Sequence, residues 1–389
     1  MDKFLKIAIF NEFYPPDHLG GAERTAQLIY ETMSGRGHDV SVLSGYVGRP
    51  SVEDRIYRKI PRYNDPRDTV SRLSFLRKLN LDTVSYFIAR DFLKRGNFSV
   101  FFVRSVRGIS FRPVMAALRL KIPVVFFVPD DWLAKLKTNR DKSSIYNHLV
   151  KKYLYGDFDF QKILCPSRKL FDDYLKAGFK EEKLLIVPHG VDTHMFRPVE
   201  KKDSSRLANI IYVGRLFPSK GVHVLVEAAR ILKVKGYGFQ VQIIGKGNDD
   251  YEKAIKSDVE NYGLKESFVF RGMVPQRDLP EYYRQADIAV IPSLEEPFGI
   301  TLIEAMASGL PVVASRVDAI PENVNDGMDG VLVDPNNPAS LAGTLGPLIE
   351  DRGKRLALGG RARQKAVQKF SLERFIDKIE TLLIEIAQG

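Results

Sequence analysis

The chain has 389 residues, 44% of them hydrophobic and 28% charged, with a formal net charge of +11; because this length exceeds what one compact core holds, it predicts two domains. The single cysteine, Cys165, excludes an internal disulfide, and its apolar surroundings predict a buried structural thiol. No apolar run reaches the roughly 18 residues that a membrane helix needs, and the first residues lack the apolar stretch of a signal peptide, so we expect a cytoplasmic chain.

Short runs of β-branched and aromatic residues alternate with helical patterns, which is typical of parallel sheets covered by helices. In the first half the predicted strands are 5–10, 40–43, 100–103, 124–128 and 163–165. In the second half they are 210–213, 240–244, 268–270, 288–291, 312–314 and 331–332. Both halves open with a strand, a glycine-containing loop and a helix. The sequence therefore predicts an α/β fold of two Rossmann-like, doubly wound domains.

Residues 188–206 carry turn residues and a charged stretch, which predicts a linker. We therefore expect an N-terminal domain over 1–190 and a C-terminal domain over 205–369. The stretch 372–387 has apolar residues at a 3.6-residue period and predicts a last helix. Periodicity does not indicate which domain this helix covers.

The window 287–315 predicts a strand, a tight loop, a helix and another buried strand. The loop through Phe298 and Gly299 brings the amides of Gly299, Ile300 and Thr301 to a helix start, where the helix dipole favours an anion such as a diphosphate. Glu296 lies before this helix start and Glu304 lies on the helix, so we expect one carboxylate to bind sugar hydroxyls and the other a ribose. The alternative is that Glu296 only favours the helix start and Glu304 is solvated.

A second cluster follows the strand 210–213, where the loop Gly214–Gly221 contains Arg215 and Lys220. Both cations are expected to reach a bound anion and to stabilise a departing nucleoside diphosphate, a role that a magnesium ion often has. The loop is not a P-loop, because Gly221 follows Lys220 in place of Ser or Thr. The alternative is two solvated loop cations.

Three segments resemble the retaining GT-B glycosyltransferases of family 4: EPFGITLIE, which carries Glu296 and Glu304, GRLFPSKG over 214–221, and GGAER over 20–24. Other stretches that look like family segments extend the resemblance over nearly the whole chain, and it is weakest between residues 46 and 100. The resemblance implies two Rossmann-like domains with a donor site between them and a last helix, about 370–389, that crosses back onto the N-terminal domain.

The resemblance also implies roles for single residues at this donor site. Arg215 and Lys220 would bind the diphosphate, Glu304 the ribose and Glu296 the donor sugar. Gly21 would lie near the phosphates, and the backbone at Met273 and Val274 would contact the base. Gly214 and Phe298 belong to the same donor-binding segments. The implied reaction is transfer with retention from a nucleotide diphosphate sugar, a UDP- or GDP-sugar, without a metal ion or other cofactor.

The chain departs from the family pattern at one position. Many relatives carry a His-Asp pair after the strand that corresponds to 124–128, and here Pro129 stands in the place of the histidine. Asp130 is a candidate for orienting donor or acceptor. The alternative is that Asp130 caps a helix.

Other function classes each rest on a single feature. The triplet Asp157-Phe158-Asp159 is the D-x-D pattern of metal-dependent GT-A transferases, but it does not follow a clear nucleotide-binding strand, so a solvated turn is the better explanation. A GT-B nucleotide-sugar epimerase would use the same donor site without an acceptor. The charge of +11 suggests a nucleic-acid-binding protein, but no motif of a known reader is present, so we expect no nucleic acid partner. A nicotinamide-dependent dehydrogenase is poorly supported, because Gly245-Lys246-Gly247 lacks the third glycine of the dinucleotide-binding pattern G-x-G-x-x-G.

The excess positive charge lies entirely in residues 1–190, which hold 33 Lys and Arg against 21 Asp and Glu. Within it, the basic stretch 49–78 is followed by an apolar-rich stretch over 79–93. We hypothesise that the basic stretch docks on anionic lipid at the inner face of a membrane and presents a lipid-linked acceptor. A solvated basic face is the alternative. The acceptor is therefore left open as a glycan, a lipid or a small molecule.

Overall fold

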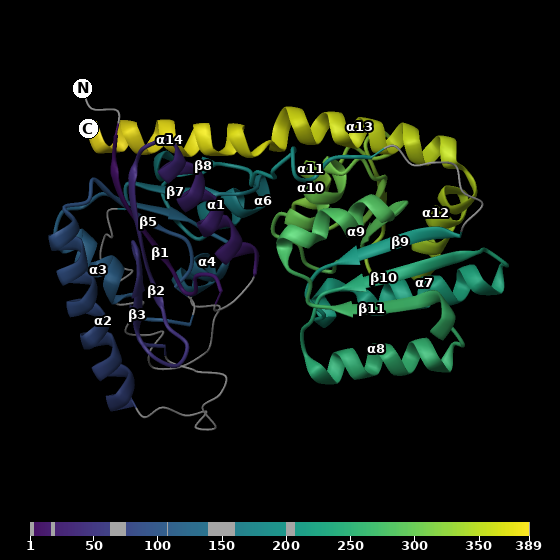
Figure 1. The fold of residues 1–389 in the computed structure, drawn as a ribbon, viewed down its shortest axis with the longest axis horizontal. Coiled ribbons are helices and arrows are strands. Elements are labelled where there is room, and N and C mark those ends of the chain that lie inside the picture. The colour runs from purple at the N-terminus through teal and green to yellow at the C-terminus, as the bar shows by residue number, and fades with distance from the viewer. Residues whose placement is uncertain are drawn as a thin grey trace. The chain divides into compact units, whose positions relative to one another are not determined.

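The computed structural model describes residues 4–16, 20–62, 75–106, 108–138, 160–199 and 207–388. The chain divides into two compact units (Figure 1). Unit 1 comprises Met1–Pro188 and Ile376–Gly389, and unit 2 comprises His189–Phe375. The D-x-D triplet at 157–159 lies outside the described residues.

In unit 1 the described strands form one sheet in the order β3-β4-β2-β1-β5-β6-β7-β8. All neighbours pair in parallel except β3 and β4, which are antiparallel. Strands such as β1 are apolar on both faces, as parallel strands covered by helices on both sides must be. The strands are β1 (Lys6–Asn11), β2 (Asp39–Gly45), β3 (Ser51–Glu53), β4 (Ile56–Ile60), β5 (Val100–Val103), β6 (Val124–Phe127), β7 (Lys162–Cys165) and β8 (Leu184–Ile186).

The described helices of unit 1 lie on its sheet and close an apolar core with it (Figure 1). They are α1 (Gly21–Gly35), α2 (Phe75–Gly96), α3 (Arg112–Arg119), α4 (Trp132–Lys137) and α6 (Arg168–Lys176). Ser167 caps α6, because its hydroxyl accepts the amide of Leu170 at 3.2 Å. Cys165 is fully buried in this core and burial raises its pKa to about 12, so the prediction of a buried thiol is confirmed.

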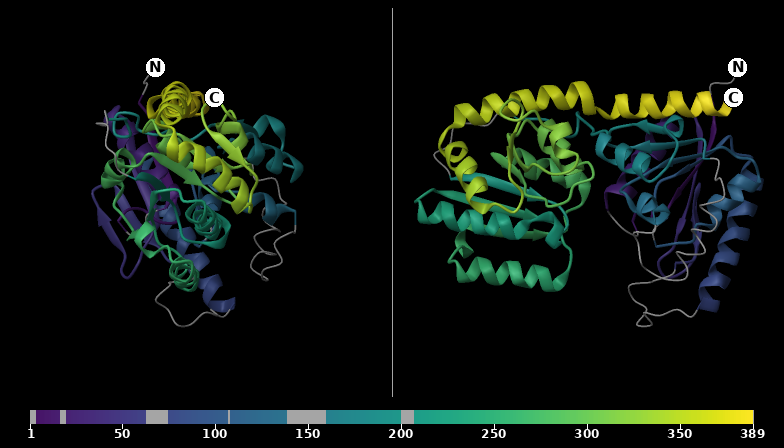
Figure 2. Two further views of the ribbon diagram at one scale, coloured as in Figure 1. Left: turned by 90° about the vertical axis from the view of Figure 1, so that its right-hand side faces the viewer. Right: turned by 180° about the vertical axis from the view of Figure 1, so that it is seen from behind.

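The C-terminal helix α14 (Leu372–Gln388) belongs to unit 1 from Ile376 onward, and the prediction of a last helix is confirmed (Figure 2). Its apolar stripe is buried, with Ile376, Ile379 and Leu383 inaccessible to solvent. Polar contacts fix the helix in register. His38 Nε2 lies 2.7 Å from Glu380 Oε1, and Arg36 pairs with Asp377 at 2.8 Å.

Unit 2 has one parallel sheet in the order β11-β10-β9-β12-β13-β14, with an apolar core on each face. The strands are β9 (Ala208–Val213), β10 (Phe239–Ile244), β11 (Phe268–Gly272), β12 (Ile288–Ile291), β13 (Val312–Ser315) and β14 (Val331–Val333). The helices are α7 (Val222–Val234), α8 (Asp249–Asn261), α9 (Leu279–Gln285), α10 (Ile300–Ala307), α11 (Ile320–Asn323), α12 (Pro338–Glu350) and α13 (Arg352–Phe370). The predicted α/β fold with two Rossmann-like sheets is confirmed.

The basic stretch 49–78 is only partly a surface feature. Arg58 is buried and donates to the carbonyl of Pro15 at 2.5 Å. Arg62 lies over the Phe13 ring, 4.0 Å from its centroid. These two arginines are therefore held by contacts within unit 1, and the docking hypothesis does not extend to them. Arg67, Arg72 and the side chains of Arg77 and Lys78 lie outside what the structure describes. In the described ranges no helix is long and apolar enough to cross a membrane.

Within unit 2, one arginine ties the segment after Val191 to two helices. Arg363 on α13 donates from Nη1 to the carbonyls of Phe196 at 2.8 Å and Ala307 at 2.7 Å. Its Nη2 donates to the carbonyl of Thr193 at 3.0 Å. The Arg363 guanidinium thus bonds both the C-terminal end of α10 and the first segment of unit 2. Partial burial lowers the pKa of Arg363.

We predict that Arg363→Met lowers the free energy of unfolding of unit 2 by about 3 kcal/mol, because three carbonyl groups lose a charged donor. Urea unfolding followed by circular dichroism measures the change. Lys369→Met removes a charge from an exposed position of the same helix and is the control. Equal effects of the two substitutions would show that the carbonyl contacts contribute nothing specific.

Candidate active site

The candidate site lies where the strand order of unit 2 reverses. β9 continues through α7 to β10 on one side, whereas β12 lies on its other side. In open parallel sheets, ligands bind outside the carboxyl ends of the strands at such a point. The loops that follow β9 and β12 are the two segments that the sequence singled out.

An ion pair joins these two loops. Lys220, in the loop after β9, lies with Nζ 2.8 Å from Glu296 Oε2 and 3.0 Å from the carbonyl oxygen of Glu295. Both side chains are mostly shielded, with 17% of Lys220 and 14% of Glu296 exposed. Gly221 follows at a φ of 68°, and a Cβ there would lie 1.9 Å from the carbonyl oxygen of Pro292. Only glycine lets the loops approach this closely.

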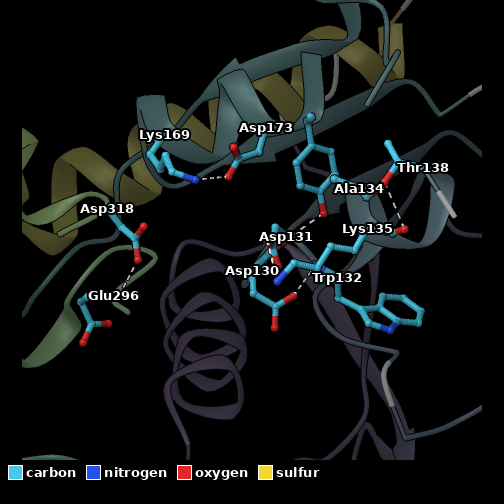
Figure 3. Close-up of polar contacts among 11 residues, drawn as sticks. Asp130, Asp131, Trp132, Ala134, Lys135, Thr138, Lys169, Asp173, Glu296 and Asp318 are labelled. Carbon is cyan, nitrogen blue, oxygen red and sulfur yellow. Dashed lines mark hydrogen bonds and ion pairs between the residues drawn. The ribbon is translucent and has the colours of Figure 1, made fainter. Parts of the chain in front are cut away.

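Further hydrogen bonds hold Glu296 in place. Ser293 Oγ donates to Glu296 Oε2 at 3.1 Å. The amide of Glu296 donates to Asp318 Oδ2 at 2.8 Å, a contact drawn in Figure 3. Ser219 accepts the amide of Leu294 at 2.8 Å. Loops after β9, β12 and β13 therefore position this one carboxylate.

The helix α10 starts at Gly299, whose φ of 92° is one that glycine favours. Among the described residues no side chain caps this end. The first amides of a helix lack an intrahelical acceptor, so those of Gly299, Ile300 and Thr301 are suited to an anion. The Phe298 side chain is buried against the His189 ring, with centroids 5.0 Å apart, which leaves only the Phe298 backbone to a ligand.

Glu304 lies on the buried side of α10 and is inaccessible to solvent. The hydroxyl of Tyr283 on α9, itself buried, lies 3.1 Å from Glu304 Oε2 and 3.3 Å from the carbonyl of Thr301. The alternative of a solvated Glu304 is therefore wrong. A buried carboxylate must be hydrogen-bonded, and Tyr283 supplies one such bond.

The candidate residues in the loop after β9 differ in their exposure and in their contacts. Lys220 is paired, which excludes the solvated alternative for it, whereas Arg215 is exposed with its guanidinium 5.3 Å from the Phe217 ring centroid. The amide of Gly214 donates to the carbonyl of Ile244 at 3.0 Å. Gly214 therefore contributes space rather than a free donor, since a Cβ there would lie 2.9 Å from the Tyr212 hydroxyl.

Met273 and Val274 follow β11, so their backbone lies at the same carboxyl edge of the sheet. The Met273 side chain is 59% exposed, and Val274 is half-buried against the core. Within the residues described, no group of three or more His, Cys, Asp or Glu side chains is arranged to hold a metal ion.

The remaining candidates belong to unit 1. Gly21 is the first residue of α1, and the amide of Gly20 before it donates to Glu23 Oε2 at 3.0 Å. Asp130 follows β6, and its Oδ1 accepts the amide of Trp132 at 2.9 Å (Figure 3). This contact closes the turn before α4, whose N-cap residue is Asp131, so Asp130 stabilises a turn and does not cap the helix.

Sequence reasoning missed Tyr283, Ser293 and Asp318. Tyr283 lies in a helical stretch and gives no signal beyond its aromatic ring. Ser293 and Asp318 are short polar residues in loops, where such residues are common. Ser293 follows a buried strand by two positions, which is the one feature that could have indicated it.

Two family models match the chain, one in each half. Residues 196–365 match the family model described as glycosyl transferases group 1, and residues 19–195 match the one described as glycosyltransferase family 4. The chain belongs to the GT-B glycosyltransferases. Its resemblance to this class is thereby confirmed.

Single proteins match over shorter or more divergent stretches. The chain is 34% identical over 198 residues to D-inositol 3-phosphate glycosyltransferase of Acidothermus cellulolyticus, covering 47% of this chain and 44% of that one. It is 31% identical over 229 residues to a putative colanic acid biosynthesis glycosyltransferase of Salmonella typhimurium, covering 57% and 56%. The match thus spans about half the length of these curated relatives.

Two solved structures share the fold over nearly all of both chains. Sucrose-phosphate synthase from Thermosynechococcus elongatus superposes with a TM-score of 0.78 at 18% identity, covering 98% of each chain. Anabaena HepE in complex with UDP and glucose superposes with a TM-score of 0.74 at 20% identity, covering 97% of this chain and 99% of that one.

We predict that Tyr283→Phe lowers stability by about 1–3 kcal/mol, because the buried Glu304 carboxylate loses a donor. Chemical unfolding of the whole chain measures it. Tyr282→Phe removes a hydroxyl from the neighbouring, half-buried position and is expected to change stability by less than about 0.5 kcal/mol. No loss in Tyr283→Phe would contradict a structural role for this hydroxyl.

Proposed function

We propose that the chain transfers a sugar from a nucleoside diphosphate sugar to an acceptor hydroxyl, with retention and without a metal ion. The observation that carries the proposal is the Lys220–Glu296 pair beside the start of α10, at the carboxyl edge where the strand order reverses. A cation, a carboxylate and helix amides at one edge can bind a diphosphate and a sugar together. The two glycosyltransferase family models support the same reaction.

In this proposal the diphosphate accepts the amides of Gly299, Ile300 and Thr301 and takes Lys220 as a counter-ion. Glu296 then exchanges the Lys220 ammonium for hydroxyls of the donor sugar, while Ser293 and Asp318 keep it in place. Arg215, which is exposed, turns toward the phosphates. The ion pair thus prearranges both partners before substrate binds.

The chemical step breaks the bond between the anomeric carbon and the phosphate oxygen, and the acceptor oxygen bonds to the same face of the sugar. The acceptor proton passes to the departing phosphate oxygen. Lys220, Arg215 and the helix amides stabilise the negative charge that develops there, which is the usual source of the largest rate gain. No protein nucleophile is required.

Glu304 is proposed to bind the ribose, and this role affects its hydrogen bond with Tyr283. Because Glu304 is buried and bonded to that hydroxyl, a ribose must either share the carboxylate with Tyr283 or displace it. Gly21 is proposed to lie near the phosphates, and the backbone at Met273 and Val274 to contact the base. UDP is the proposed nucleotide, because HepE, a protein of the same fold, has been solved with it.

The acceptor is proposed to be a hydroxyl of a cell-envelope or exopolysaccharide precursor, glycan or lipid-linked. One relative is named for colanic acid biosynthesis, which motivates this choice. Unit 1 would hold the acceptor, with Asp130 at its carboxyl edge. Of the basic stretch, Arg49, Arg55 and Lys59 are exposed and stay candidates for contact with anionic lipid at the cytoplasmic membrane face.

We predict that EDTA leaves turnover of a UDP- or GDP-sugar unchanged, because charge on the leaving group is stabilised by Lys220, Arg215 and amides. Nucleotide release measures turnover, and proton NMR of the glycoside reports its anomeric configuration. Loss of activity on chelation with recovery on adding magnesium or manganese would contradict metal independence. Donor turnover without any acceptor would instead favour the epimerase alternative.

We predict that Lys220→Ala and Arg215→Ala each lower kcat by roughly 100-fold or more, as loss of a donor to a developing anion does. Glu304→Gln is expected chiefly to weaken binding of free UDP, as measured by calorimetry. Lys235→Ala, at the far end of α7, is the matched control and should keep wild-type kinetics. Unchanged UDP affinity in Glu304→Gln would remove its ribose role.

A further inference from the structure

The segment after β13 holds the loop before α10 by its backbone. The carboxylate of Asp318 accepts the amide of Glu296 at 2.8 Å (Figure 3). The amide of Ala319 donates to the carbonyl of Glu296 at 3.3 Å. The third contact comes from a side chain on α11, because Asn323 Nδ2 donates to the carbonyl of Phe298 at 2.7 Å. One neighbouring segment thus fixes three backbone groups of the loop.

The contact between Asn323 and Phe298 is buried, with 5% of Asn323 and 3% of Phe298 exposed. The Phe298 ring packs against the rings of His189 and Phe370, at centroid distances of 5.0 Å and 6.1 Å. Among the described residues the Phe298 carbonyl accepts no other hydrogen bond. A buried carbonyl without a donor is costly, so the orientation of this peptide group depends on Asn323.

The direction of the Phe298 carbonyl sets the direction of the next amide. A trans peptide group is planar, with its C=O and its N–H on opposite sides. Because the Phe298 carbonyl points to Asn323, the N–H of Gly299 points away from α11. Gly299 is buried, and its amide has no acceptor among the residues that the structure describes. Unpaired buried amides are rare in proteins, so this one is suited to a phosphate oxygen of a ligand.

A glycine can also adopt the opposite orientation of this peptide group. Gly299 has a φ of 92°, in the left-handed region. A half-turn of the Phe298–Gly299 peptide group would give Gly299 a negative φ, which is usual for the residue before a helix. The carbonyl oxygen would then lie where the amide lies now, and it would repel a phosphate. That orientation loses the hydrogen bond from Asn323, so the bond selects the orientation that presents the amide.

We propose that Asn323 is a positioning residue for the donor diphosphate, because it holds the Gly299 amide toward the phosphate oxygens. This inference rests on the proposed transferase function and deepens it, since it gives α11 a part in binding the leaving group. Asn323 acts through the Phe298–Gly299 peptide group and does not itself contact the diphosphate. The amide that it directs stabilises the charge that develops on the leaving phosphate, so its loss lowers turnover as well as binding.

The first test measures binding of UDP to the full chain by calorimetry and binding of uridine by NMR titration. Asn323→Leu keeps the approximate size of the side chain and removes the donor. We expect this variant to bind UDP at least tenfold more weakly, and to bind uridine, which has no phosphate, as the wild type does. Equal weakening of UDP and uridine would show a general structural role and overturn the proposal.

Asn325→Leu is the matched control for this substitution. Asn325 is exposed two positions further along the chain, and its side chain bonds no other described residue. The control should bind UDP and uridine as the wild type does.

The second test observes the Gly299 amide directly. Phe298-Gly299 is the only Phe-Gly pair in the sequence, so a chain labelled with 13C at the Phe carbonyl and with 15N in Gly gives one HNCO signal. In the wild type we expect saturating UDP, and also pyrophosphate, to shift this signal. In Asn323→Leu the signal of the free chain should move, and UDP should shift it less than half as far. No shift of the wild-type signal with either ligand would overturn the proposal without any variant.

Kinetics separate this inference from the proposed reaction. Asn323→Leu should lower kcat/KM for the donor at least tenfold. A wild-type kcat and donor KM in Asn323→Leu would contradict the role of Asn323 and leave the transferase function standing. A wild type that turns over no UDP- or GDP-sugar, but whose Gly299 signal shifts with UDP and shifts less in Asn323→Leu, would contradict the proposed reaction and support the role of Asn323.

Discussion

The contact between Lys220 and Glu296 is the constraint on which the candidate site depends, because it holds together the two loops at the point where the strand order reverses. A largely shielded ion pair loses hydration, so it is stable only when further hydrogen bonds satisfy its members. Ser293 and the carbonyl of Glu295 provide them. Gly221 makes the contact sterically possible, since any Cβ there would meet the Pro292 carbonyl. The site is therefore arranged before substrate arrives.

The sequence predicted the parts of the fold that depend on periodicity. Buried parallel strands are apolar throughout, so β1, β5 and β12 were evident, and the apolar period of α14 was equally clear. The short strands β3 and β4 were missed because they carry charged residues and turn through Asp54 at a φ of 50°. Such a hairpin is fixed by its turn and its neighbour β2, and neither leaves a pattern in the residues themselves.

The candidate site was predictable where backbone geometry decided it, and not where side-chain contacts did. Gly299 before an apolar helix indicates a helix start from residue type alone. Tyr283 meets Glu304 only because α9 and α10 pack together, and their packing has no signature in sequence. Counting the basic residues of 49–78 also failed to predict which of them are exposed, because burial depends on packing. Arg58 and Lys59 are neighbours on one strand, yet their side chains lie on opposite faces, so one is buried and the other exposed.

Parallel strands also explain where the candidate residues of unit 1 lie. The carboxyl ends of the parallel strands lie at one edge of the sheet, and the turn at Asp130 follows β6 at that edge. The strand β1 ends at the same edge, where the chain leads toward α1. A ligand bound only by the folded unit stabilises it as a whole, by an amount set by concentration and affinity. A ligand held at the carboxyl edge would therefore stabilise the strands of unit 1 together, and not only the loops that it contacts.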